Sequence, residues 1–266
     1  MTDGPSRCPG LYVLGCALRE LRESRGMSLR ELAGKLGFSP PSLSNWETGE
    51  RSIESGQLGW ILGYLRVSPA ERQLLMQLHR QSERTSHVEI LTPGEPSLQG
   101  VYERHALHTF QWAPHVVPDL LQTSAYAHAV LGHVVQADDV DQEILTRQVR
   151  QLERDRRHRH TVLLGAAAVN HELVPPEVRH AQRDHITALA DRGLVKAGVV
   201  KENLGSAGTT KPFVIYLTEN NVSTVVLPHE HTAVYLSDSV SVRRYWSTFT
   251  ALQENSVGYG TLADAC

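Results

Sequence analysis

The sequence predicts an α+β fold, mainly α-helical with a smaller antiparallel β part, in which a helical head precedes a mixed domain. Apolar residues recur at helical spacing through residues 1–84, short runs rich in β-branched residues occupy 195–236, and a segment with two prolines and a glycine separates the two patterns. A chain of 266 residues is long enough for two such units. We therefore expect a head at 1–84, a linker at 85–98 and a second domain at 99–266.

Capping and stop signals predict five short helices in the head. Ser28 and Glu31 form a capping box that opens the second helix, and Gly37 ends it, since glycine readily adopts the positive φ of a helix C-terminus. Ser39 and Ser68 take the N-cap positions of the third and fifth helices, and proline follows each of them. The expected helices cover residues 14–24, 28–36, 39–48, 55–65 and 68–84.

The second domain is expected to combine helices with an antiparallel meander. Its helices are expected at residues 99–112, 119–133, 138–159, 177–192 and 239–254. Short β-like runs occupy residues 195–200, 212–218, 222–227 and 232–236. A further run rich in Val, Leu and Ala covers 161–169, and the Asn220–Asn221 pair suits a tight hairpin between two of the strands.

Composition narrows the class of protein. The three cysteines, Cys8, Cys16 and Cys266, are odd in number and lack C-x-x-C spacing, so we expect neither a disulfide framework nor a structural zinc site, and a reducing cytoplasm fits best. The longest apolar run, residues 161–169, is far shorter than the roughly 20 residues of a membrane helix. The first ten residues lack the pattern of a secretory signal. We expect a cytoplasmic protein without a membrane partner.

Residues 28–49, SLRELAGKLGFSPPSLSNWETG, contain the parts of a helix-turn-helix. Ala33 is small where two helices approach closely, Gly37 makes the turn, and apolar residues form a seam between the helices. The seam residues are Leu32, Leu36, Leu43 and Trp46. On these features, residues 14–66 resemble the phage-repressor and Cro-like (XRE) family of regulators, which implies a DNA-binding head.

The resemblance also implies roles for individual side chains. In that family an Arg of the first helix commonly pairs with the Glu that ends the recognition helix. Arg22 and Glu47 occupy those positions, so we expect a partly buried, structural ion pair. The family's base-reading positions fall here on Pro40, Pro41, Ser44 and Asn45.

Among these positions Asn45 is the best base reader, because its amide can bond both N6 and N7 of adenine. Ser42 and Ser44 can bond a phosphate or a base edge, and Arg30 and Arg51 can contact phosphate. Backbone N–H groups at the start of the second helix add a further phosphate site. The expected partner is therefore double-stranded DNA.

The two prolines depart from the polar residues usual at these positions. Their geometry suits the first turn of a helix, where an N–H has no intrahelical acceptor. Pro40 and Pro41 remove hydrogen-bonding capacity, however. Three interpretations stay open: the prolines only rigidify the helix start, they contact thymine methyl groups, or specific reading has been lost.

The charge of the chain is unevenly distributed. The whole chain carries −3, whereas residues 1–84 hold 11 Lys and Arg against 9 Asp and Glu, a net charge of +2. The rest of the chain carries −5. Such a mildly basic head attracts phosphate weakly, so a single head should bind DNA poorly. We therefore expect a homodimer on DNA.

The segment 101–131 carries a second resemblance. Its pattern W-x-P-x-x-V-P-x-L-L-Q-T-x-x-Y-A-x-A-V resembles the DUF5753 (WhiJ-like) domain that follows such heads in many actinobacterial regulators. The resemblance implies a role in development or secondary metabolism, often beside a small partner protein. This chain departs from the family at LLGAAAVNHEL, where a V-L-D-E-x-x-L-like stretch is common, so whatever that region contacts could differ.

The aromatic residues of this region have two interpretations. Most of them are expected to form a hydrophobic core. The alternative is a pocket for a small-molecule effector. Its lining residues would be Tyr102, Phe110, Trp112 and Tyr126.

No catalytic or metal constellation is evident, so we expect no enzyme and no cofactor. His229 and His231 could share a strand face, but no third zinc ligand stands in register with them. His171-Glu172 begins an H-E-x-x-H pattern that fails because residue 175 is Pro.

The leading hypothesis is a dimeric, sequence-specific transcriptional regulator that a ligand or a partner protein controls through the second domain. The alternative is an antitoxin-like or developmental protein-interaction module whose DNA contact only tethers a partner. A lesser alternative is a small-metabolite enzyme with a relict DNA-binding head. The operator, the direction of regulation and the effector are open at this point.

Overall fold

The computed structural model describes residues 9–82, 84–91, 97–132, 144, 158–200, 211–218, 223–229 and 231–259. The predicted helix 138–159 lies outside these ranges except for Ile144 and the last two residues, and Asn220 and Asn221 lie outside them too. No helix among the described residues is long and apolar enough to cross a membrane.

The head is the predicted bundle of five helices. They are α1 (Pro9–Ser24), α2 (Leu29–Leu36), α3 (Pro40–Glu47), α4 (Ser55–Tyr64) and α5 (Pro69–Gln81). Leucines at helical spacing, among them Leu18, Leu32, Leu43, Leu58 and Leu78, are fully buried between these helices. The first helix begins five residues earlier than predicted, at Pro9, and packs against both α3 and α5.

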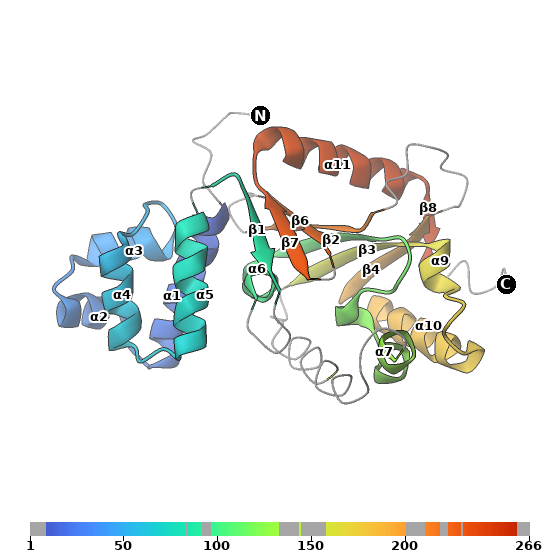
Figure 1. Ribbon diagram of the computed structural model, residues 1–266, viewed down its shortest axis with the longest axis horizontal. Coiled ribbons are helices and arrows are strands. Elements are labelled where there is room, and N and C mark those ends of the chain that lie inside the picture. The colour runs from blue at the N-terminus through green and yellow to red at the C-terminus, as the bar shows by residue number, and fades with distance from the viewer. Residues whose placement is uncertain are drawn as a thin grey trace.

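The second part is built around one eight-stranded mixed sheet (Figure 1). Its strands are β1 (Ser86–Ile90), β2 (His108–Ala113), β3 (Arg159–Gly165), β4 (Val195–Val200), β5 (Phe213–Leu217), β6 (Ser223–Pro228), β7 (Thr232–Leu236) and β8 (Ser256–Gly258). Their order in the sheet is β1-β7-β6-β5-β2-β3-β4-β8. The predicted α+β class is confirmed.

Helices cover both faces of this sheet. One face carries α11 (Ser239–Glu254), which packs over β6 and β4 (Figure 1). The other elements are α6 (Leu98–His105), η1 (Asp119–Leu121), α7 (Ser124–Leu131), α9 (Ala166–Val169) and α10 (Pro176–Asp191). On the face opposite α11, Tyr102 of α6 contacts Tyr216 and Tyr235 of the sheet, and α10 packs against β4.

Two predictions for this part are wrong. Residues 108–112, predicted as the end of a helix, form β2, because pairing with β3 on one side and β5 on the other satisfies the backbone of this stretch. The sheet is not an antiparallel meander throughout: β2, β3 and β4 run parallel to one another. These two errors share a cause, since a parallel pair forms between segments far apart in the chain and leaves no local turn signal.

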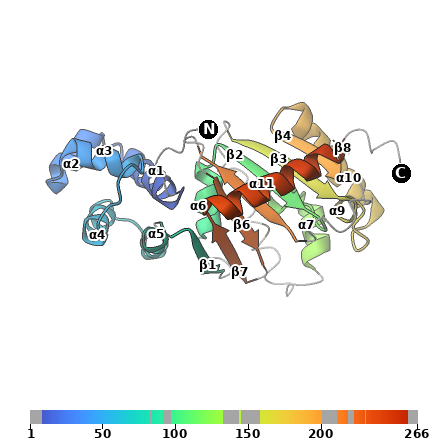
Figure 2. The same ribbon diagram turned by 90° about the horizontal axis from the view of Figure 1, so that it is seen from above.

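The head and the sheet share a continuous hydrophobic core. Residues of the head such as Val13 and Leu78 belong to the same buried cluster as Tyr102 and Tyr235 of the second part. Glu20 Oε2 of α1 lies 3.4 Å from His105 Nε2 of α6. The segment 85–98, predicted to link the domains, contains β1, which follows α5 closely and pairs with β7 (Figure 2). The head is therefore packed against the sheet rather than tethered to it by a free chain.

Candidate nucleic-acid interface

The helix before α3, α2, is capped at both ends. Ser28 Oγ accepts the N–H of Glu31 at 3.2 Å, while the Glu31 carboxylate accepts the N–H of Ser28 at 3.1 Å. Gly37 ends α2 in the left-handed conformation, with φ of 73°. The chain thus leaves α2 sharply and enters α3 within three residues.

The start of α3 is capped by serine and stiffened by proline. Ser39 Oγ accepts the N–H of Ser42 at 3.2 Å, and the two hydroxyls lie 2.8 Å apart. Pro40 and Pro41 occupy the first two helical positions and are exposed. Since those positions need no N–H, the prolines cost α3 no hydrogen bond.

One face of α3 is buried and the opposite face is open. Leu43 and Trp46 are buried in the head core. At about 100° per residue, Pro41 and Asn45 lie one above the other on the opposite face, with Ser44 beside them. Within the described ranges, neither the Asn45 amide nor the Ser44 hydroxyl makes a side-chain hydrogen bond. This face therefore offers unused polar groups at helix spacing.

A buried ion pair joins α3 to α1. Arg22 donates from Nε to Glu47 Oε1 at 2.7 Å and from Nη2 to Glu47 Oε2 at 2.8 Å, and both residues are buried. The same guanidinium donates to the carbonyl of Met27 at 2.8 Å. Hydrogen bonding to Glu47 raises the pKa of Arg22. The pair is more deeply buried than expected from the sequence and fixes the C-terminal end of α3.

The expected phosphate-binding arginines are exposed. Arg30 lies in the first turn of α2, and Arg51 follows α3. The N–H of Arg51 donates to the carbonyl of Asn45 at 3.2 Å, which holds this segment against the end of α3. Neither guanidinium has an ion-pair partner among the described residues.

The four aromatic residues expected to line an effector pocket do not share a cavity. They lie in three separate core clusters, because they come from α6, β2 and α7, which pack against different parts of the sheet. Tyr102 packs against tyrosines of β5 and β7, whereas Phe110 and Trp112 pack beneath α11. Tyr126 belongs to the cluster under α10, where its hydroxyl accepts the N–H of Val117 at 3.3 Å. The core interpretation holds for these side chains.

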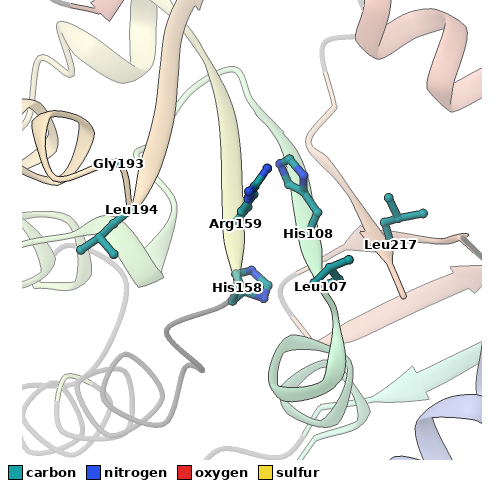
Figure 3. Close-up of a pocket in the computed structure, with 7 residues that line it drawn as sticks. All are labelled: Leu107, His108, His158, Arg159, Gly193, Leu194 and Leu217. Carbon is teal, nitrogen blue, oxygen red and sulfur yellow. The ribbon is translucent and has the colours of Figure 1, made fainter. Parts of the chain in front are cut away.

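A different pocket lies where β2 and β3 begin, with a volume of about 550 Å³ (Figure 3). It is lined by Leu107, His108, His158, Arg159, Gly193, Leu194 and Leu217. The sequence provided no signal for it, because its walls come from segments that only the parallel pairing of β2 with β3 brings together.

The pocket combines leucine walls with two imidazoles and the guanidinium of Arg159. His158 is held by the carbonyl of Ala106 at 2.8 Å and the hydroxyl of Thr109 at 2.9 Å. Burial, with the nearby charges of Arg159 and Lys196, lowers the pKa of His108, so this imidazole is neutral at neutral pH. The exposed Arg159 guanidinium lies beside His108 (Figure 3) and supplies the positive charge.

In the ranges that the structure describes, no three His, Cys, Asp or Glu side chains come together as metal ligands would.

Comparison with protein families finds two matches. A model described as a helix-turn-helix domain matches residues 13–75, and a model described as a domain of unknown function, DUF5753, matches residues 99–259. The two matched ranges agree with the head and with most of the second part.

Individual proteins are also similar to this chain. A protein of Thermococcus kodakarensis, named as a candidate HTH-type transcriptional regulatory protein, is 54% identical over 46 residues, which are 16% of this chain. The chain spans only 14% of that relative's length. Two solved structures are also similar. The clp gene regulator ClgR from C. glutamicum is 34% identical over 26% of this chain and 88% of its own, with a TM-score of 0.24. The archaeal chromatin protein TrmBL2 is 12% identical over 87% of this chain and 88% of its own, with a TM-score of 0.33.

Proposed function

We propose that this chain, which belongs to the DUF5753 family and carries a helix-turn-helix domain ahead of that family's domain, is a transcriptional regulator. It would bind specific sequences of double-stranded DNA. The observation that carries the proposal is the open face of α3, where Asn45 and Ser44 present unused polar groups while the opposite face is anchored in the core. A helix held in this way can enter the major groove with its exposed face toward the bases.

Each residue of the candidate interface has a proposed part in DNA contact. Asn45 reads adenine, and Ser44 bonds a neighbouring base edge or phosphate. Ser42 shares its hydroxyl with Ser39 at the cap, so we assign it to phosphate. Arg30 and Arg51 contact phosphates of the DNA backbone. We propose that Pro40 and Pro41 rigidify the start of α3, with their exposed rings left to contact thymine methyl groups.

We expect Asn45→Ala to weaken binding to the preferred site by about 10- to 100-fold, the usual discrimination of one bidentate base contact. Binding to unrelated DNA should not change, because phosphate contacts carry it. The preferred site is first obtained by selection from a random duplex library. Affinities are then measured by fluorescence anisotropy at two salt concentrations.

Two further variants complete this experiment. Gln73→Ala, exposed on α5, is the matched control and should bind as the wild type does. Arg51→Ala should weaken binding to all sequences alike and lower the salt slope by about one. A library that yields no enriched sequence would contradict specific reading and favour a head that binds DNA only through its backbone.

We further propose that the regulator acts as a homodimer in the cytoplasm, without catalysing a reaction. The head carries a net charge of only +2, so one copy has little general attraction for DNA. Two heads on one duplex raise the effective concentration of the second and overcome this weakness. Turnover of a small metabolite by the purified chain would contradict the non-enzymatic assignment.

The pocket at the start of β2 and β3 supports control by a small molecule. Its leucine walls and the cation Arg159 suit an amphipathic anion, with a carboxylate at the guanidinium and an apolar tail against Leu107, Leu194 and Leu217. His158 also connects this pocket to the end of α6, through its hydrogen bond to the carbonyl of Ala106. A bound anion could therefore act on the helix that contacts the head.

Octanoate is a simple probe of this site. At tenfold its dissociation constant it should stabilise the chain by about 1.4 kcal/mol and raise Tm by about 2 to 4 °C. Octanol, which lacks the charge, should do less. The increase should vanish in Arg159→Gln but persist in Arg243→Gln, an exposed arginine on α11. Equal effects of octanoate on both variants, measured by thermal-shift assay, would rule out the pocket as an anion site.

A further inference from the structure

Among the residues that the structure describes, β1 pairs with a strand on one side only, so it lies at an edge of the sheet. The N–H of Leu91 donates to the carbonyl of His231 and the N–H of Ser237 to the carbonyl of Thr85, both at 2.8 Å. In an antiparallel ladder these bonds alternate along the strand. The backbone groups of His87 and Glu89 therefore point toward β7, and those of Ser86, Val88 and Ile90 point away from the sheet.

Two of these three residues, Val88 and Ile90, present apolar side chains to solvent. Val88 is 56% exposed and Ile90 is 78% exposed. Figure 2 shows that α11 crosses the sheet to one side of β1 and leaves this strand uncovered on that face, whereas Leu236 of β7 packs against the cluster beneath α11. Val234 of β7 lies opposite Val88 and extends the apolar row inward. An edge with unused N–H and C=O groups and exposed β-branched residues is a template for a further strand.

Proline and an outward-facing lysine, two of the usual protections of an edge strand, are missing from β1. Residues 86–90, SHVEI, contain no proline and no lysine. The only carboxylate, Glu89, is turned beneath the sheet, where it accepts the N–H of Leu98 at 2.7 Å and the hydroxyl of Tyr235 at 2.5 Å. The carboxylate of Glu89 therefore does not lie at the unpaired side of β1.

We propose that a second copy of this chain occupies the edge, so that the two β1 strands pair antiparallel about a two-fold axis at Val88 and join the two sheets into one. This assignment rests on the proposed function only in that a regulator with paired heads needs a dimer. The assignment adds that β1 is the surface through which the dimer forms.

The sequence of β1 is complementary to itself in this register. Val88 faces the partner's Val88, and the row Val234–Val88 continues across the axis into its symmetry copy. The small Ser86 faces the partner's Ile90, which lets the larger side chain fill the space. On the other face His87 lies opposite the partner's Glu89. The His87 Nε2 atom is buried and has no hydrogen-bond partner among the described residues. An unrelated peptide would match these positions only by coincidence.

Pairing through β1 would also fix the spacing of the two heads. The fifth helix ends at Gln81 and β1 begins at Ser86, and the head shares its core with α6. Each head is thus held close to the two-fold axis by packed structure. Five-residue strands bury little area, so the free dimer should be weak and a duplex with two half-sites should strengthen it.

Sedimentation equilibrium of the full chain without DNA, from 1 to 100 µM, tests this surface. The wild type should show a concentration-dependent monomer–dimer equilibrium. Val88→Lys and Ile90→Lys should each raise the dimer dissociation constant at least tenfold, because a lysine on the edge opposes strand pairing. Val240→Lys, at a valine that is 52% exposed on α11, is the matched control and should leave the equilibrium unchanged. Thermal melts verify that all three variants fold.

The outcomes are distinguishable. A monomer at every concentration would overturn the proposal, and so would a dimer that both edge variants retain. A monomeric chain that captures an extended segment of another protein on β1 would replace the second copy with that partner. Because no DNA is present, none of these results depends on whether α3 reads bases. Conversely, failure of the library selection would leave the dimer equilibrium unaffected.

Discussion

Replacing Glu47 with alanine should lower the free energy of unfolding of the head by about 3 to 5 kcal/mol, because it leaves the Arg22 guanidinium buried without its counter-charge. Glu47 is 2% exposed and Arg22 6% exposed, so water cannot replace the lost carboxylate. Both charged hydrogen bonds, at 2.7 and 2.8 Å, disappear together. Urea unfolding, with hydrogen exchange of the α3 amides to localise the effect, measures this loss.

A neighbouring arginine provides the control. Arg19 Nε lies 3.7 Å from Glu47 Oε2, but its side chain is 44% exposed, so Arg19→Ala should change stability by less than about 1 kcal/mol. The double variant Arg22→Met with Glu47→Leu should be more stable than Glu47→Ala alone, since it removes both buried charges. If Glu47→Ala and Arg19→Ala cost the same, the pair is not the anchor of α3 that its geometry indicates.

The head could be predicted closely because its signals are local. Ser28 with Glu31, Ser39 and Gly37 act within four residues of their own positions, and the structure shows each of them at the cap where the sequence places it. The depth of the Arg22–Glu47 pair was harder to predict. Burial depends on how α1 packs over α3, which involves residues 25 positions apart.

The second part was predicted less well because its structure depends on distant partners. The stretch His108–Ala113 contains aromatic residues that fit either a helix or a strand, and pairing with Arg159–Leu164 decides the outcome. The pocket exists only after that pairing, so Arg159 could not be singled out as a binding residue. The four aromatic candidates lie in different cores because they come from three elements: Tyr102 from α6, Phe110 and Trp112 from one face of β2, and Tyr126 from α7.

The second large effect concerns Gly15, where alanine should lower the stability of the head by about 2 to 3 kcal/mol through overpacking. A Cβ atom at this position would lie 2.5 Å from the carbonyl oxygen of Trp46 and 2.6 Å from that of Glu47. These are backbone atoms at the end of α3, so no side-chain rotation relieves the contact. Either α1 or the end of the recognition helix must move, and affinity for the selected DNA should fall with stability.

The opposite result is expected at Gly34, which makes a matched comparison. Gly34 lies in the middle of α2, and a Cβ atom there would meet nothing within 4 Å. Gly34→Ala should therefore stabilise the head by about 0.5 to 1 kcal/mol, because alanine favours the helix more than glycine does. From the sequence alone the two glycines look alike, each interrupting a helical pattern. Only the close crossing of α1 over α3 separates them, so equal changes in urea midpoint would show that this crossing is looser than described.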